Sequence, residues 1–237
     1  MSIHVKTSGS WKEIVSPHVK MGGSWKPCKE VFVRVSGSWK KVWPVSDPAT
    51  YTWNAIWSQT YRADGPKVTP DIVSGLDAAS DLMQGFWENM PPVGAGFVTS
   101  LIGFDRVDIQ AKLAERPVIK SVRLRLMVKL DYGNQGTRAR VATHDKGAEP
   151  SSFSYTAFVD NSVYTDGTKR AEGVAVWHTL PDSVGNQLRD DTIRGLGLYD
   201  VSRSTSETNK VEYRGAWYGE AATSTQEPVL EITADYI

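Results

Sequence analysis

The residues in this sequence that are best able to take part in catalysis or ligand binding are its histidines, its acids and its aromatic rings. The four histidines are scattered, and only His144 has an adjacent acid, Asp145, that could orient its imidazole. This pair falls in an expected turn without a third catalytic member, so we interpret His144 as a surface histidine. The chain has no Gly-x-Ser-x-Gly nucleophile motif, no His-Glu-x-x-His helix and no glycine-rich phosphate loop. These patterns predict a protein that is not an enzyme and needs no metal or cofactor.

Four acids near aromatic residues keep one enzymatic alternative open, a glycosidase. A glycosidase pair is defined by the distance between its carboxyl groups, roughly 5 to 9 Å, which a sequence does not give. Acids at strand ends are usually solvated turn residues, so we favour the non-catalytic interpretation, which a reducing-sugar assay on a polysaccharide would test. The four acids are Asp81, Glu88, Asp105 and Asp108.

Aromatic side chains are better candidates for function. Sugars present flat C–H faces that stack on Trp and Tyr rings, while their hydroxyls bond planar polar groups nearby. The chain has nine Trp and nine Tyr, and alternation in residues 211–218 predicts a buried Trp217 and an exposed Tyr218. Taken singly, each ring is more often a packing residue than a ligand contact. The glycan-binding candidates are Trp87, Tyr132, Tyr155, Tyr164, Arg214 and Tyr218.

The segments that would position these rings are predicted to be short strands. The clearest is residues 122–130, where Val and Leu alternate strictly with Arg, Met and Lys, the pattern of a half-buried strand. A turn follows at 131–136, and we expect 137–143 to be the partner strand of 122–130. The other expected strands are residues 51–62, 99–107, 174–180, 192–199, 210–218 and 229–237.

The rest of this region is expected to be turns and loops. Helical turns are predicted only at 77–83 and 184–190, residues 144–170 are loop-rich, and we find no amphipathic run of helix length. About eight strands over roughly 180 residues is the size of a jelly-roll β-sandwich. We therefore predict an all-β protein in which residues 49–237 form a jelly-roll-type sandwich.

The first 45 residues repeat one phrase, Val-Lys/Arg-x-x-Gly-Ser-Trp-Lys, three times with a period of 14. This length suits a β-hairpin whose glycine supplies the positive φ of a tight turn. A unit of this size cannot bury its own apolar face. We therefore expect the indoles to form the core of a small sheet or an assembly interface. An exposed aromatic ladder for sugars or another protein is the alternative. The repeated positions are Gly9, Trp11, Gly23, Trp25, Gly37 and Trp39.

The overall composition limits which classes of partner and which cellular locations are compatible with the chain. Lys+Arg and Asp+Glu both number 27, and this neutrality argues against a nucleic-acid binder. The chain contains no apolar run of about 18 residues, the length that would indicate a membrane-spanning helix. The first residues lack the apolar core of a signal peptide. Cys28 is the single cysteine, which excludes an intramolecular disulfide.

Two sets of motifs resemble the minor tail proteins of long-tailed bacteriophages, especially those that infect actinobacteria. The first set is the N-terminal repeats, which look like the Gly-Gly-x-Trp-Lys repeats at the start of such proteins. The second is a series of short motifs in the expected order along the rest of the chain. The prolines Pro91 and Pro92 depart from the pattern. The motif series is residues 61–65, 84–85, 100–105, 119–126, 194–198, 213–219 and 228–233.

The resemblance implies a virion component of the tail tip or fibre, made in the host cytoplasm. Its N-terminal repeats, residues 1–45, would seat it on other phage structural proteins, and its sandwich would face a host-surface glycan. Because short stacked repeats gain buried area from neighbours, we expect a homo-oligomer, with a trimer as the specific expectation. No catalytic residue carries over from the resemblance. The alternatives are a capsid decoration or head fibre protein, and a carbohydrate-binding module without catalysis.

Overall fold

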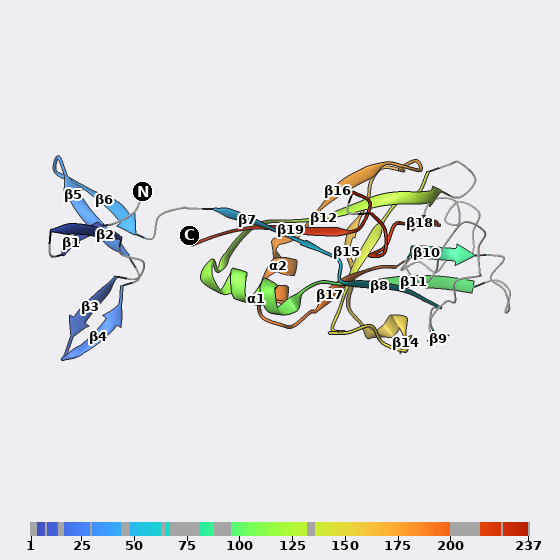
Figure 1. Cartoon of the computed structure of the whole chain (residues 1–237), viewed down its shortest axis with the longest axis horizontal. Coiled ribbons are helices and arrows are strands. Elements are labelled where there is room, and N and C mark those ends of the chain that lie inside the picture. Colours follow the sequence, from blue (N-terminus) through green and yellow to red (C-terminus); the bar gives the residue numbers. More distant parts are fainter. Residues whose placement is uncertain are drawn as a thin grey trace.

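The computed structural model describes residues 4–7, 9–13, 17–28, 30–43, 48–62, 65–66, 81–87, 96–131, 136–199, 214–223 and 225–236. Three antiparallel hairpins occupy the N-terminal repeats, as predicted (Figure 1). The repeated glycines Gly9, Gly23 and Gly37 have φ of 87, 84 and 82°, so each turn uses the conformation that glycine adopts without strain. The hairpins are β1 (His4–Thr7) with β2 (Ser10–Glu13), β3 (His18–Met21) with β4 (Ser24–Pro27), and β5 (Val31–Val35) with β6 (Ser38–Trp43).

The remainder of the chain, which we call the β domain, is mostly antiparallel strand where it is described, and its described ranges contain two α-helices and a short 3₁₀ helix, Tyr155–Ala157. The helices are α1 (Arg106–Glu115) and α2 (Asp182–Arg189). The strands are β7 (Ala49–Asn54), β8 (Trp57–Arg62), β9 (Gly65–Pro66), β10 (Leu82–Trp87), β11 (Gly96–Gly103), β12 (Val118–Asp131), β13 (Arg140–His144), β14 (Ser152–Phe153), β15 (Phe158–Thr165), β16 (Ala175–Leu180), β17 (Gly195–Leu198), β18 (Gly215–Trp217) and β19 (Val229–Asp235).

Most of these strands belong to one sheet that folds over into two layers. The β12 layer has the order β16-β12-β19-β7, and the β11 layer has the order β15-β13-β17-β11-β8. Strands β10 and β18 connect them, since β10 pairs with β11 and β18 pairs with both β10 and β12. Leu124 and Leu230 of the β12 layer share one core with Ile102 and Leu196 of the β11 layer (Figure 1). The all-β class is thus confirmed, while the jelly-roll topology stays a prediction.

Strand β12 bears out the alternation read from the sequence as far as Val128, and a register irregularity follows that leaves Leu130 half-buried. Val122, Leu124, Leu126 and Val128 are buried in the core, and the Arg, Met and Lys residues between them are half-buried on the other face. Its expected partner was wrong, however. Residues 137–143 do not return along β12, because β13 pairs with β15 and β17 in the other layer. The partners of β12 come from far along the chain and are β16, β18 and β19.

Three further expectations need correction. Residues 51–62 form two strands, because the chain leaves the β12 layer at Ala55 and enters the β11 layer at Trp57. The region 144–170 contains β14 and β15, and the expectation that no helix exists is contradicted by α1 and α2. Of the predicted helical turns, that at 184–190 is part of α2. Residues 77–80 of the other predicted turn lie outside the described residues. Its last two residues, 82 and 83, belong to strand β10, which begins at Leu82.

Helix α1 begins at an N-cap, because Asp105 accepts a hydrogen bond from the backbone N–H of Asp108 at 3.1 Å. Only Ile109 and Leu113, one turn apart, are buried on it. Together with α2 it lies at the end of the β domain nearer the hairpins (Figure 1). Within the described residues, neither helix has the length and apolar character needed to cross a bilayer.

The outer face of the β11 layer carries a row of four residues in register, Trp57, Gly103, Gly195 and His144. The rings of Trp57 and His144 lean over the two glycines, and their centroids are 5.6 Å apart. A Cβ on Gly103 would lie 2.0 Å from the Trp57 indole. The two glycines therefore provide the space in which these rings meet.

Candidate ligand-binding face

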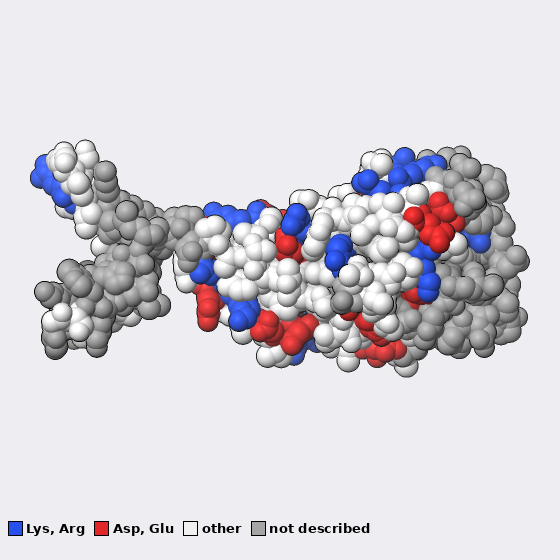
Figure 2. Space-filling model, turned by 45° about the horizontal axis from the view of Figure 1, so that its top comes forward, with Lys and Arg blue, Asp and Glu red and all other residues white. Residues whose placement is uncertain are grey.

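The outer face of the β12 layer brings aromatic and planar polar side chains together. Arg123, Arg125 and Lys129 of β12 point away from the core. The strand register places Trp177 of β16 opposite Arg125, and Glu231 of β19 opposite Arg123. Directly opposed residues share a face. These side chains consequently form one surface. Figure 2 shows that basic and acidic groups are interspersed over the side of the β domain that it presents.

Trp177 is the most open aromatic ring on this face, with 36% of its surface exposed. The guanidinium carbon of Arg123 lies 4.9 Å from the centroid of its ring. Arg123 is itself fixed, because its Nε donates a hydrogen bond to Glu231 Oε1 at 2.8 Å. The guanidinium lies over the indole, and the carboxylate that binds it lies beside it. These polar groups are therefore held in place next to a flat apolar ring.

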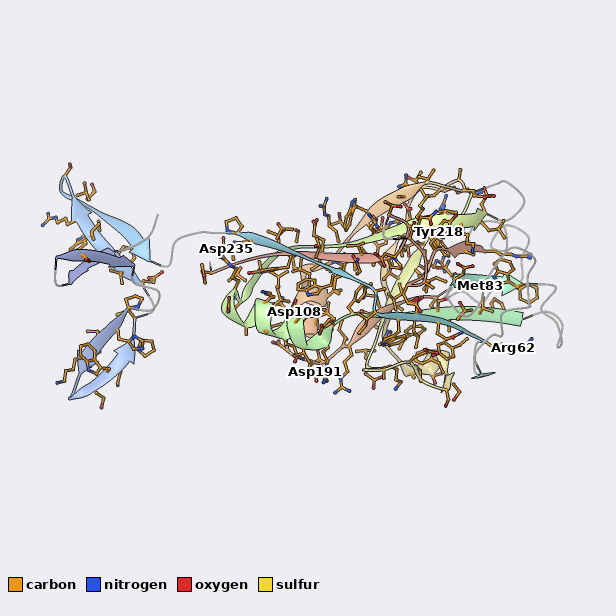
Figure 3. The ribbon with its side chains drawn as sticks, in the orientation of Figure 1. Arg62, Met83, Asp108, Asp191, Tyr218 and Asp235 are labelled. Atoms are coloured by element: carbon orange, nitrogen blue, oxygen red, sulfur yellow. The ribbon has the colours of Figure 1, made fainter. Side chains whose placement is uncertain are left out.

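Tyr218 lies on the opposite side of β12 from Trp177. Its backbone N–H donates to Met127 O at 3.1 Å, and its half-buried ring has Lys129 Nζ 5.4 Å from its centroid (Figure 3). Lys129 in turn pairs with Asp81 at 2.6 Å. Because neighbouring strands are about 4.8 Å apart, the backbone positions of Trp177 and Tyr218 are roughly 10 to 12 Å apart, allowing for the offset of two residues.

Further polar groups on this face are held in place. Arg125 Nη2 donates to the backbone oxygen of Glu227 at 3.1 Å, and Asn54 Nδ2 donates to Glu227 Oε1 at 2.7 Å. Side chains restrained in this way lose little conformational entropy when a ligand binds. Chemically, the arrangement can stack against a flat apolar ligand surface and hydrogen-bond polar groups beside it.

The candidates chosen from sequence do not all gather here. Trp87 is buried in β10, with the guanidinium carbon of Arg214 4.5 Å from its ring centroid and its Nε1–H donated to Gln84 O at 3.1 Å. Arg214 is buried as well, so this pair has a packing role and offers no free ring face. Tyr218 is on the outer face, as expected, but it is half-buried rather than exposed. Tyr132 and the side chain of Tyr155 lie outside the described part of the chain.

Tyr164 belongs to a separate buried polar cluster between the edge strands β15 and β16. Its ring centroid is 5.4 Å from that of His178, and Asp166 Oδ2 lies 3.7 Å from His178 Nδ1. Asp166 accepts hydrogen bonds from Arg170 Nε at 3.0 Å and from the N–H of Thr168 at 2.9 Å. Burial lowers the pKa of His178, and burial with the nearby Asp166 charge raises the pKa of Tyr164. Since Asp166 and His178 are almost fully buried, we assign the cluster to the joining of the layers.

His144 is not a surface residue, contrary to the sequence interpretation. It is fully buried, its Nε2 lies 3.2 Å from Ile102 O, and Lys146 N–H donates to its Nδ1 at 3.1 Å. These partners define the neutral tautomer protonated on Nε2. Desolvation by burial, the dominant cause, lowers the pKa of His144 to about 4. Both ring nitrogens are occupied, so the residue is structural.

The acids considered for glycosidase chemistry have structural partners where the chain is described. Asp81 pairs with Lys129, Asp105 caps α1, and Asp108 accepts from Trp53 Nε1 at 2.8 Å. Glu88 lies outside the described residues. Within the described ranges, no group of three or more His, Cys, Asp or Glu side chains is placed to hold a metal ion.

Trp177 is the functional candidate that sequence reasoning missed, although its strand was predicted. In 174–180 the alternation places Val176, His178 and Leu180 on one face, which leaves Trp177 on the other. That signal was sufficient to mark an outward-facing indole.

No protein-family model matches the chain, and no curated protein is significantly similar to it in sequence.

Proposed function

We propose that this chain is a non-enzymatic attachment protein of a bacteriophage tail, of the minor tail, tip or fibre type. Its hairpins anchor it to other particle proteins, and its β domain presents a face to host glycans. The observation that carries the anchoring role is the exposure of the hairpin indoles, 68% for Trp25 and 69% for Trp39. The resemblance of the repeats and of the motif series to tail proteins supplies the biological setting.

The hairpins are poorly suited to exist without a partner. The expectation that their indoles form the core of a small sheet is contradicted for Trp25 and Trp39, because each hairpin is a separate two-stranded sheet. An isolated hairpin is marginally stable in water. Exposed apolar clusters on a folded protein typically mark interaction sites. Docking on another protein would both cover the indoles and stabilise the hairpins.

Changing Trp25 and Trp39 together to serine in the full chain is expected to reduce its incorporation into phage particles at least tenfold. The reason is the loss of two large apolar contacts at the anchoring surface. The measurement is the amount of the protein in purified particles, by quantitative immunoblot. Val107→Ser is the matched control, since Val107 is 69% exposed on α1. Equal incorporation of both variants and the wild type would contradict the anchoring role.

A second function, glycan binding by the β domain, is favoured by the Trp177 face. A head fibre or decoration protein could share this architecture, and labelling the protein on intact particles separates the tail from the head. A carbohydrate-binding module would show the same saccharide affinity without belonging to a particle. Both alternatives therefore depend on where the protein is found rather than on its fold.

Trp177→Ala is expected to weaken binding of the full chain to purified host wall polysaccharide roughly tenfold, about 1.4 kcal/mol. The substitution removes the stacking surface and leaves Arg123 without its aromatic neighbour. Binding is measured by co-sedimentation, with near-ultraviolet circular dichroism to verify folding. Val159→Ala, at an exposed apolar residue of β15, is the control. Unchanged binding by the Trp177 variant would show that this face is not the saccharide site.

A further inference from the structure

Charge is divided unevenly between the two parts of this neutral chain. Residues 1–45 contain eight Lys and Arg against two Glu, a net charge of +6. Because the whole chain has 27 of each sign, residues 46–237 carry 19 basic and 25 acidic residues, a net charge of −6. Such an asymmetry points to a partner for the basic segment that has the opposite charge.

Within each hairpin the strand register places a cation directly opposite the tryptophan. Opposed residues of an antiparallel pair share a face, with Cβ atoms about 5 Å apart. In the second and third hairpins, whose side chains are described, the indole and the cation are therefore presented together, 14 residues apart from one hairpin to the next. The three pairs are Lys6 with Trp11, Lys20 with Trp25, and Arg34 with Trp39.

The opposite face of the second and third hairpins carries open apolar side chains, with Ser24 and Lys26 of β4 and Ser38 of β6 across from them. Val19 and Met21 of β3, and Val33 and Val35 of β5, are exposed on that face. A polysaccharide or a nucleic acid would use the indole and the cation and leave these side chains in water. A protein surface, in contrast, can bury both faces of a hairpin. The distribution of apolar residues thus favours a protein as occupant.

We propose that the three hairpins dock on an acidic protein surface of the particle. Each indole enters an apolar pocket, and the cation opposite it pairs with a carboxylate at the pocket rim. This inference rests on the proposed anchoring function and names the chemistry of the partner. It departs from the expectation that hairpins of several copies stack on each other, because two segments of +6 repel.

The linkage of three equivalent units in one chain adds to the strength of such docking. Once one hairpin is bound, the others bind at the high effective concentration that a short linker imposes. Reversing the charge of two hairpins therefore affects binding by much more than a single surface ion pair would. It also makes binding strongly dependent on salt, because exposed ion pairs are screened within about 10 Å at 0.1 M salt.

The test adds purified full-length chain to phage particles that genetically lack it and measures the bound fraction from about 0.05 to 0.5 M NaCl. Lys20→Glu with Arg34→Glu is expected to weaken binding at least tenfold. Lys20→Arg with Arg34→Lys should bind like the wild type. The matched control is Lys112→Glu with Lys120→Glu, a charge change of equal size at exposed lysines of α1 and β12.

The possible results separate the two proposals. If wild-type chain does not rebind to the depleted particles, the anchoring function itself fails. If it rebinds but neither salt nor charge reversal at Lys20 and Arg34 changes the bound fraction, anchoring stands and the acidic partner is excluded. Competition by duplex DNA or host wall polysaccharide would overturn a protein occupant. Self-association of the wild-type chain in sedimentation velocity, lost in the charge-reversed variant, would instead assign the surface to a second copy.

Discussion

Gly195→Ala will destabilise the β domain by about 3 kcal/mol or more. A Cβ at this position would lie 2.3 Å from the carbonyl oxygen of Ile102 and 2.5 Å from the His144 ring. The carbonyl belongs to the strand ladder between β17 and β11 and cannot move without breaking register. The ring cannot move freely either, since both of its nitrogens have partners. The added methyl group must therefore displace backbone.

Chemical denaturation of the full chain, followed by near-ultraviolet circular dichroism, measures this loss as a lower midpoint with an unchanged slope. Gly147→Ala is the matched control, because its Cβ would meet only Arg194, at 3.5 Å, an ordinary contact. We expect that variant to stay within about 0.5 kcal/mol of the wild type. A Gly195 variant as stable as the Gly147 variant would show that the row of rings and glycines can relax.

Lowering the pH from 7 to 4 will remove stability through His144, by up to about 3 kcal/mol. The folded protein holds this histidine neutral, with a pKa of about 4, whereas the unfolded chain binds a proton near the ordinary value of 6.5. The unfolded state therefore binds more protons below pH 6.5, and stability falls with pH until the folded pKa is reached. His178, whose pKa burial also lowers, acts in the same direction.

Free energies of unfolding at pH 7, 5.5 and 4 for the wild type and His144→Gln isolate this contribution. The variant is expected to be less stable at pH 7 and to depend less on pH between 6.5 and 4. Asp145 and Lys146, which are adjacent, are present in both proteins, and the hydrogen bond from Lys146 lowers the pKa of Asp145 in each. Parallel pH profiles of the two proteins would contradict the assignment.

Local patterns in the sequence identified the elements whose signal is periodic. The 14-residue repeat predicts the hairpins, and the alternation in 122–130 predicts β12 and its buried face. Helix α1 was not predicted from the sequence, because only Ile109 and Leu113 are buried on it and the sequence therefore shows no broad apolar stripe. Its start was nevertheless readable, since Asp105 three residues before Asp108 is a recognisable N-cap arrangement.

Long-range pairing was not readable from the sequence. The turn after β12 suggested that β13 returns beside it, yet β19, more than 90 residues away, occupies that place. The same limit applies to the site. Whether a ring such as Trp87 is open or covered depends on Arg214, which is distant in sequence and arrives beside it through β18. Trp177, in contrast, needed only the face assignment of its own strand.

The pairing of β7 with β19 has a mechanical consequence for a protein anchored at one end and bound to a cell at the other. Strand β7 is the first of the β domain after the hairpins, and it pairs along its whole length with β19, which pairs with β12 beneath the Trp177 face. Tension applied through the hairpins runs along β7, nearly parallel to the long axis in Figure 1. The ladder is then loaded in shear, so its hydrogen bonds resist together rather than opening one after another. In the attachment role proposed above, the chain would thereby transmit a pulling force from particle to host through the strands that also carry the candidate ligand-binding face.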